Sequence, residues 1–203
     1  MHKSKLGMRD KYDVSRDLLC YPNSSTLINL MGIQDANELE KVEADLTYLR
    51  AELFEPNFSQ LDLAYLCQIH QHLFQDIYSW AGELRTVDIS KGQTRFCSAL
   101  FVEKESNKLF KKLANENYLV GLDRTLFIER VVDYFCELNV IHPFREGNGR
   151  TQRLFFEVLI ANAGYAVDWS NINKQQWILA NVAGYMGDLS LLKTLFAKII
   201  QYA

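Results

Sequence analysis

Apolar residues recur at steps of three and four along most of the chain, which is the spacing of an amphipathic helix. The first such segment covers residues 35–53, with Asp35 as its expected N-cap. Its apolar stripe consists of Leu39, Val42, Leu46 and Leu49. Pro56 follows shortly afterwards and cannot continue a helix, so this element is predicted to end before residue 56.

The same spacing continues after that break. A segment resembling a capping box, Ser59-Gln60-Leu61-Asp62, precedes a second predicted helix that runs to Trp80 and is stopped by Gly82. Its stripe consists of Leu63, Leu66, Ile69, Leu73 and Ile77. Further helices are expected at residues 103–116, 124–141, 149–163, 173–183 and 188–201. The stripe of the 124–141 helix consists of Phe127, Val131, Phe135 and Leu138.

Residues 84–101 change the period from helical to alternating. Val87 and Ile89 flank Asp88, and the turn residues 91–94 are followed by a second short apolar run. This pattern favours a β-hairpin over an irregular surface loop, the alternative that the sequence leaves open. A lone hairpin has unpaired edges, and such an edge can receive an extended peptide.

These elements predict a mainly α fold, a helical bundle with one β-hairpin. The length of 203 residues suits one domain. Residues 1–26 are polar and irregular and are interpreted as an N-terminal arm, which leaves residues 27–203 as the folded domain.

Composition narrows the class of protein further. Hydrophobic residues make up 48 % of the chain, and the 12 Phe and 10 Tyr suggest an aromatic-rich interior. The net charge of −3 gives no overall basic excess for binding nucleic acid or an anionic membrane. The four cysteines lack metal or disulfide spacing. No apolar stretch reaches the roughly 18 residues of a membrane span, and there is no secretory signal, so a cytoplasmic location is expected.

The residues that suggest chemistry lie between two of the predicted helices. Gly147, Asn148 and Gly149 stand where the second helix begins. Backbone N–H groups at a helix start are unpaired, and glycines allow a ligand to approach closely, so this turn is suited to binding a phosphate. Arg150 and Arg153 are three residues apart, on one face of the helix, where both can reach the same anion.

Two more groups complete this segment. Glu146 places a carboxylate beside the expected phosphate site, where it can hold a divalent metal. His142 has an unperturbed pKa of about 6.5, which suits a general base at neutral pH. Each residue alone has an ordinary structural explanation. From the residues alone, phosphate chemistry and a structural loop both remain open; the joint spacing is what favours chemistry.

The segment resembles the signature of the Fic (filamentation induced by cAMP) family, His-x-Phe-x-Asp/Glu-Gly-Asn-Gly-Arg-x-x-Arg. Every defined position matches, from His142 through Arg153. The resemblance includes Trp80-Ala81-Gly82-x-x-Arg85 and the hairpin, and it extends over most of residues 60–195. It implies the Fic fold, a helical bundle with one β-hairpin flap.

The resemblance also implies roles in a protein adenylyltransferase, an enzyme that moves AMP from ATP onto a hydroxyl side chain of a target protein. His142 would deprotonate the hydroxyl, and Glu146 would bind Mg²⁺ at the phosphates of ATP. The phosphates themselves would be bound by Gly147, Asn148, Gly149, Arg150 and Arg153. In the flap, Lys91 and Gly92 would border the nucleotide and align the target. Asn181, within residues 173–186, is expected in the adenine pocket.

Gly149 bears on the reaction class. A related branch, the Doc-like toxins, has lysine at this position and transfers phosphate. The glycine of this chain therefore favours AMP transfer. A phosphotransferase of the same fold, and a non-catalytic module that binds phosphate or peptide, are the alternative functions.

Many Fic proteins carry an inhibitory helix with the pattern Ser/Thr-x-x-x-Glu-Gly/Asn. The chain has Glu four residues after Ser79 and after Thr125, but in neither case does Gly or Asn follow. The resemblance to short bacterial Fic toxins then implies a separate small antitoxin that supplies the helix in trans, seated along an apolar groove of residues 27–53. It also implies a type II topoisomerase subunit as the target.

Overall fold

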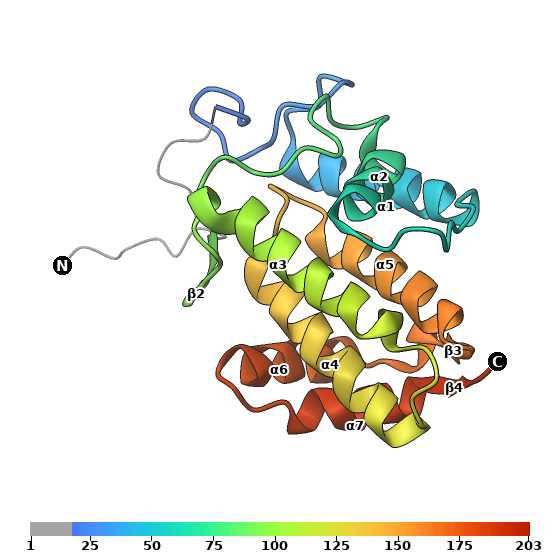
Figure 1. Cartoon of the computed structure of the whole chain (residues 1–203). Coiled ribbons are helices and arrows are strands. Elements are labelled where there is room, and N and C mark those ends of the chain that lie inside the picture. Colours follow the sequence, from blue (N-terminus) through green and yellow to red (C-terminus); the bar gives the residue numbers. More distant parts are fainter. Residues whose placement is uncertain (1–17) are drawn as a thin grey trace.

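The computed structural model describes residues 18–203. Helices account for most of it, and two pairs of short strands lie at its edges (Figure 1). The helices are α1 (Ala36–Glu52), α2 (Leu63–Phe74), α3 (Val102–Asn115), α4 (Arg124–Ile141), α5 (Asn148–Asn162), α6 (Lys174–Tyr185) and α7 (Ser190–Ile199). Single 3₁₀ turns lie at Ala99–Phe101, Asn117–Leu119 and Trp169–Asn171. The strands are β1 (Ser90–Lys91), β2 (Thr94–Arg95), β3 (Tyr165–Val167) and β4 (Ile200–Tyr202). The predicted fold class is confirmed.

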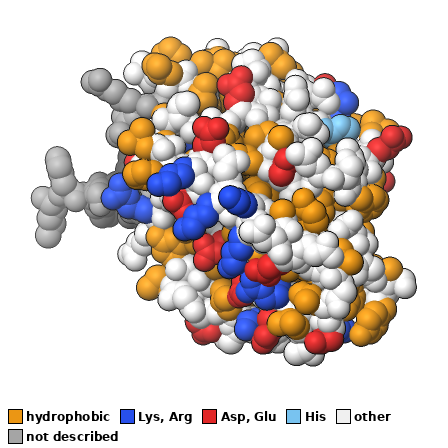
Figure 2. All heavy atoms as spheres, in the orientation of Figure 1, with side chains coloured by type: hydrophobic (Ala, Val, Ile, Leu, Met, Phe, Trp, Pro, Cys, Tyr) orange, Lys and Arg blue, Asp and Glu red, His pale blue; other side chains and the backbone are white. Residues whose placement is uncertain are grey.

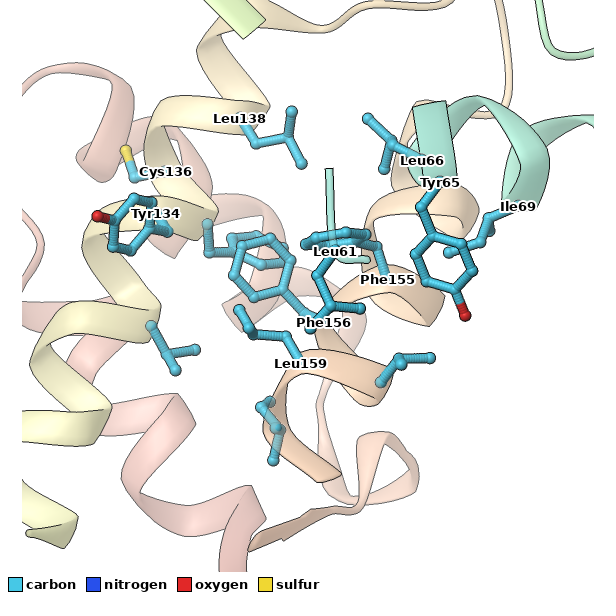
Figure 3. Packing of buried hydrophobic residues seen from close by; sticks show 14 of the residues in the cluster. Leu61, Tyr65, Leu66, Ile69, Tyr134, Cys136, Leu138, Phe155, Phe156 and Leu159 are labelled. Carbon is cyan, nitrogen blue, oxygen red and sulfur yellow. The ribbon is translucent and has the colours of Figure 1, made fainter. Parts of the chain in front are cut away.

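Helices α4 and α5 form the centre of the bundle. In Figure 1, α1 and α2 lie on one side of them, and α6 and α7 lie on the other. The predicted stripe of α4 is entirely buried. On α5, Phe155, Phe156 and Leu159 lie between side chains of α2 and side chains of α4 (Figure 3). The aromatic-rich interior expected from the composition is confirmed, and it holds the connection between α4 and α5 in a fixed place.

Helix α1 has the predicted extent and N-cap, since the Asp35 carboxylate accepts a hydrogen bond from the N–H of Glu38 at 2.8 Å. Its predicted stripe is only partly correct. Leu39 is buried, but Leu49 is 57 % exposed, and the other buried residues of the helix are Glu43 and Thr47. Polar side chains take these inward positions because they bind polar groups of the bundle, a contact that the period of apolar residues does not reveal.

Helix α2 is shorter than predicted. Asp62, not Ser59, caps it, with its carboxylate accepting a hydrogen bond from the N–H of Tyr65 at 2.9 Å. The helix ends at Phe74, six residues before the predicted end, although Ile77 and Trp80 remain buried. Both side chains lie in the turns after the helix and are buried there by tertiary packing. Their apolar positions in the sequence therefore resembled a continuation of the helical stripe.

The hairpin is confirmed, with two residues in each strand and Ser90 opposite Arg95. A second strand pair was missed at the C-terminus. Residues 200–201, predicted as the end of the last helix, belong to β4, which pairs antiparallel with β3. No disulfide joins any two of the four cysteines, all of which lie in the described part of the chain.

The predicted arm, residues 1–26, lies outside the described residues except for its last part, where Cys20 forms a β-bridge with Leu27. None of the described helices combines the length and the apolar character needed to cross a membrane. On the face shown in Figure 2, basic and acidic side chains are interspersed. On α3, for example, Lys108 forms an ion pair with Glu105 at 3.6 Å.

Candidate active site

A cavity of about 600 Å³ lies between the start of α5, the hairpin and α6. Its wall includes every predicted site residue except Asn148: Lys91, Gly92, His142, Glu146, Gly147, Gly149, Arg150, Arg153 and Asn181. The structure thus brings together residues that lie up to 90 positions apart in the chain. The volume falls in the range of about 300–1,000 Å³ that is typical of small-molecule sites.

His142 caps the C-terminus of α4 in the left-handed conformation, with φ of 51°. Its Nδ1 lies 3.0 Å from the carbonyl oxygen of Asn139. Because a carbonyl only accepts hydrogen bonds, Nδ1 carries the proton, and the neutral ring keeps its lone pair on Nε2. The ring of Phe96 stacks on the imidazole at 3.8 Å between centroids. These contacts fix the tautomer and the plane of the ring.

Burial lowers the pKa of His142 to about 3, with the nearby charges of Arg85 and Lys91 acting in the same direction. The hydrogen bond to Asn139 opposes this shift. The expectation of an ordinary pKa near 6.5 is therefore wrong for the folded chain. Desolvation penalises the imidazolium form, so His142 is neutral throughout the physiological pH range.

Gly147 begins α5 with φ of 79°, and a Cβ at this position would lie 2.2 Å from the ring of Phe74. Only glycine fits this turn. The N–H of Gly147 donates to the carboxylate of Glu146 at 2.7 Å. The N–H groups of Asn148 and Gly149 form no hydrogen bond within the described part of the chain. N–H donors at a helix start, beside a cavity, are suited to binding an anion.

Asn148 differs from its neighbours because its side chain turns away from the cavity. The carboxamide oxygen accepts from the N–H of Phe144 at 2.8 Å, and the amide nitrogen donates to the carbonyl of Phe144 at 2.7 Å. The predicted role of Asn148 in lining the phosphate site is therefore not a role of its side chain. This side chain holds the shape of the loop, and a nucleotide contact through its N–H stays a prediction.

The two arginines of the segment have different surroundings. Arg150 forms an ion pair with the buried carboxylate of Glu43, and its Nη1 donates to the hydroxyl of Thr47 at 3.2 Å. It also lies 3.7 Å from the carboxylate of Glu146. The charge of Arg150 is thus already compensated by α1, which the spacing of the two arginines did not indicate.

Arg153 lines the same cavity, but no hydrogen bond or ion pair joins its guanidinium to the described residues. Burial lowers its pKa, and the charge of Arg150 acts in the same direction. A half-buried cation without a carboxylate partner is suited to binding an anion, since the anion supplies the missing compensation. Phosphate binding by Arg150 and by Arg153 stays a prediction, and of the two only Arg150 has a carboxylate partner among the described residues.

The opposite wall comes from the hairpin and α6. Lys91 and Gly92 lie at the tip of the hairpin, and Asn181 faces the cavity from α6. The hydroxyl of Tyr185 donates to the carbonyl of Arg95 at 2.8 Å and so ties the hairpin to α6. The bond thus joins two elements that both border the cavity.

Sequence reasoning missed several residues of the wall: Glu43, Phe96, Phe135, Asn139 and Gln152. Trp177 and Tyr185 also line the wall and lie within residues 173–186, the region expected to form the adenine pocket. Phe135 was assigned to the core stripe of α4. Asn139 gave a possible signal, since it precedes His142 by three residues and lies on the same helical face. The others come from elements whose approach only the tertiary structure reveals.

The profile of the Fic/DOC family matches residues 60–160. A relative from Salmonella typhimurium, named probable protein adenylyltransferase Fic, is 46 % identical over 196 residues, which are 97 % of this chain and 98 % of the relative. The chain belongs to the Fic/DOC family. The relative of the same name from Escherichia coli is 44 % identical over 97 % of this chain and 98 % of its own length.

Solved Fic structures share the fold. The effector protein BepC of Bartonella tribocorum, crystallised with bound AMPPNP, superposes with a TM-score of 0.85 at 32 % identity, over 91 % of this chain and 97 % of that one. The family resemblance inferred from the His142–Arg153 signature is thereby confirmed, together with the helical Fic fold.

Proposed function

We propose that this chain transfers AMP from ATP to a hydroxyl side chain of another protein. The observation that carries the proposal is the cavity in which a neutral histidine, open helix N–H groups and an uncompensated arginine converge. The enzyme class expected from the sequence, protein adenylyltransferase, is the one that the names of the Salmonella and Escherichia relatives give. That BepC was crystallised with an ATP analogue supports nucleotide binding in the shared fold.

In this reaction Nε2 of His142 accepts the proton of the target hydroxyl. The hydroxyl oxygen then bonds to the α-phosphorus of ATP while the bond from that phosphorus to the bridging oxygen breaks, and pyrophosphate leaves. The N–H groups at the start of α5 donate to phosphate oxygens, and Arg153 neutralises the terminal phosphates. The low pKa of His142 keeps the base unprotonated, and the negative phosphates raise that pKa as ATP binds.

A divalent cation fits the same wall. The carboxylate of Glu146 borders the cavity and is oriented by the N–H of Gly147. Within the described chain no group of three His, Cys, Asp or Glu side chains could hold a metal alone. Mg²⁺ is commonly held by one or two carboxylates together with substrate phosphates, so Glu146 is the residue proposed to hold it. When bound, the ion neutralises charge on the phosphates.

The hairpin is the proposed site of target alignment. Lys91 and Gly92 border the cavity, and a hairpin edge can pair with an extended segment of another protein. Asn181 is proposed to contact the nucleotide from α6, where its amide nitrogen donates to the carbonyl of Trp177 at 2.8 Å.

Gly149 supports AMP transfer over phosphate transfer. Among the described residues, a Cβ added there would come close to the guanidinium of Arg153, with Nη1 at 3.8 Å. The glycine therefore leaves open the part of the cavity beside Arg153, where the terminal phosphates are proposed to lie. A lysine at this position would place a second cation in that space.

Labelled ATP tests the reaction. We expect the chain to transfer label from the α-phosphate, and none from the γ-phosphate, to a protein in a bacterial extract. His142→Asn, which keeps the left-handed backbone that Asn tolerates, should abolish transfer. Transfer of γ-label alone would replace the proposal with a phosphotransferase. An absence of label from both positions, with ATP still bound, would indicate a binding module.

We propose further that the chain is the toxin of a toxin–antitoxin pair, with a type II topoisomerase subunit as its target. The support is the absence of a Ser/Thr-x-x-x-Glu-Gly/Asn pattern from the sequence. Exposed apolar side chains along residues 27–53 also offer a seat for the antitoxin: Ile28, Leu30, Met31, Tyr48, Leu49 and Leu53.

Expression in bacteria tests this pairing. The wild-type chain should arrest growth and His142→Asn should not, and a small neighbouring gene product with the inhibitory pattern should restore growth. Leu49→Arg, on the exposed face of α1, should weaken that rescue while growth arrest persists. Growth arrest by His142→Asn would contradict the toxin role. Rescue that is unchanged by Leu49→Arg would contradict the proposed antitoxin seat on residues 27–53. Label from α-labelled ATP on a purified topoisomerase subunit tests the target.

A further inference from the structure

Arg85 ends the segment Trp80-Ala81-Gly82-x-x-Arg85, which the proposed nucleotide contacts leave unexplained. It lies in the connection between α2 and β1 and is only 4 % exposed. Arg85 does not belong to the wall of the nucleotide cavity. A buried guanidinium close to a proposed active site, but not in it, needs its own explanation.

One side of Arg85 binds the backbone that carries His142. The backbone N–H of Arg85 donates to the carbonyl of Pro143 at 2.9 Å. Its Nε donates to the carbonyl of His142 at 2.8 Å, and Nη2 donates to the carbonyl of Ile141 at 3.1 Å. Three consecutive carbonyls at the end of α4 are therefore held by this one residue.

The other side of Arg85 binds the base of the hairpin. Nη1 donates to the carbonyl of Val87 at 2.7 Å, and Nη2 also donates to the carbonyl of Cys97. Val87 precedes β1 and Cys97 follows β2, so both legs of the hairpin are fixed to the same guanidinium. The N–H of Cys97 donates directly to the carbonyl of Val140, at 3.0 Å. Arg85 and this bond together join the hairpin to the end of α4.

The conformation of His142 makes this support necessary. Its φ of 51° is unfavourable for a residue with a side chain, and such conformations persist only where the surroundings hold them. The carbonyls at a helix C-terminus also lack partners within the helix. The planar fork of an arginine supplies several donors in fixed directions, which the single ammonium of a lysine does not.

We propose that Arg85 is a positioning residue that holds His142 and the target-aligning hairpin in one fixed geometry. The inference rests on the proposed function, in which His142 is the base and the hairpin aligns the target. Since Arg85 lies outside the nucleotide cavity, its loss should impair transfer while leaving nucleotide affinity unchanged. Loss of a residue that only stabilised the fold would affect transfer and nucleotide affinity together.

The test compares Arg85→Met and Arg85→Lys with the wild-type chain. Arg130→Met is the matched control, because Arg130 is a half-buried arginine bound to Glu116 and Asp133 and lies outside both the cavity and the hairpin. Four quantities are measured: the melting temperature, the Kd for AMPPNP by calorimetry, and the kcat and KM for transfer of α-label to a protein that the wild type modifies. The ¹⁵N spectrum of the His142 ring reports its tautomer.

For Arg85→Met we expect kcat to fall about 100-fold and the KM for the target to rise, as follows from displacing a base by about 1 Å. The Kd for AMPPNP should stay within about twofold, and the ring of His142 should lose its single Nδ1–H tautomer. The kcat of Arg85→Lys should lie between that of Arg85→Met and that of the wild type. Arg130→Met should lower the melting temperature but keep kcat.

Two results would overturn the inference: a kcat of Arg85→Met close to that of the wild type, or a loss of AMPPNP affinity as large as the loss of kcat. If Arg85→Met does not fold, Arg85→Lys gives the same comparison. If the wild type modifies no protein, the proposed function fails. The tautomer of His142 in the arginine variants then still tests whether Arg85 positions that ring.

Discussion

The depressed pKa of His142 predicts a specific dependence of stability on pH. The folded pKa is about 3, whereas the unfolded chain has a value near 6.5. As the pH falls, the unfolded chain therefore binds a proton first, and the free energy of unfolding decreases over the window from about pH 6.5 to about pH 3. Above pH 6.5 the group makes no contribution to the pH dependence.

The magnitude follows from the difference in bound protons. One proton of difference changes the free energy of unfolding by about 1.4 kcal/mol per pH unit. Between pH 8 and pH 5 the unfolded His142 protonates over about 1.5 units while the folded ring stays neutral, so the loss is about 2 kcal/mol. His70, completely buried and with a pKa lowered to about 4 chiefly by burial, adds a similar loss over the same range.

Urea denaturation of the wild type and of His142→Asn at pH 8, 7, 6 and 5 measures this effect. Asn accepts the left-handed backbone and has no titrating group. The variant should lose about 2 kcal/mol less stability than the wild type between pH 8 and pH 5. His70 and the carboxylates contribute equally in both proteins and cancel. Parallel curves would refute the reasoning, because they would mean that the folded ring titrates near 6.5.

Four further outcomes follow from the site. The kcat/KM for ATP, which reports the enzyme before ATP binds, should show no acid limb near pH 6.5; such a limb would contradict a base that is already neutral. Gly147→Ala should lower the free energy of unfolding by about 3 kcal/mol in urea titrations, because it adds a clash with the ring of Phe74 to an unfavourable φ. Arg150→Met should cost about 3 kcal/mol of stability because it removes the cation beside the buried carboxylate of Glu43. Arg153→Met should change stability little but raise the Kd for AMPPNP at least about tenfold, measured by calorimetry. Equal effects of the two arginine variants on both quantities would contradict the separate roles.

The part of the candidate site that comes from one continuous segment of the chain was predictable from the sequence. His142 through Arg153 form one connection between two helices, so a helix start, a glycine turn and two arginines on one face follow from spacing alone. The hairpin also followed from a local change of period. The spacing does not predict which groups from distant elements bind each residue, and these partners differ from one residue to the next.

The two arginines illustrate the limit. They are equivalent in the sequence, three residues apart on α5, yet one is bound by Glu43 from α1 and the other is left to the cavity. The stripe of α1 was misread for the same reason, because its inward polar residues are explained only by the groups that they bind, which come from the segment after α2 and from α5.

The sequence by itself determined the helical fold, the position of the hairpin and the chemical groups of the site, because each depends on periods and spacings of a few residues. Only the tertiary structure decided which of those groups carry a free charge, which proton His142 bears, and what holds it. Those properties depend on burial and on hydrogen bonds between segments far apart in the chain. Arg85, 57 residues before His142, is an example of such a contact.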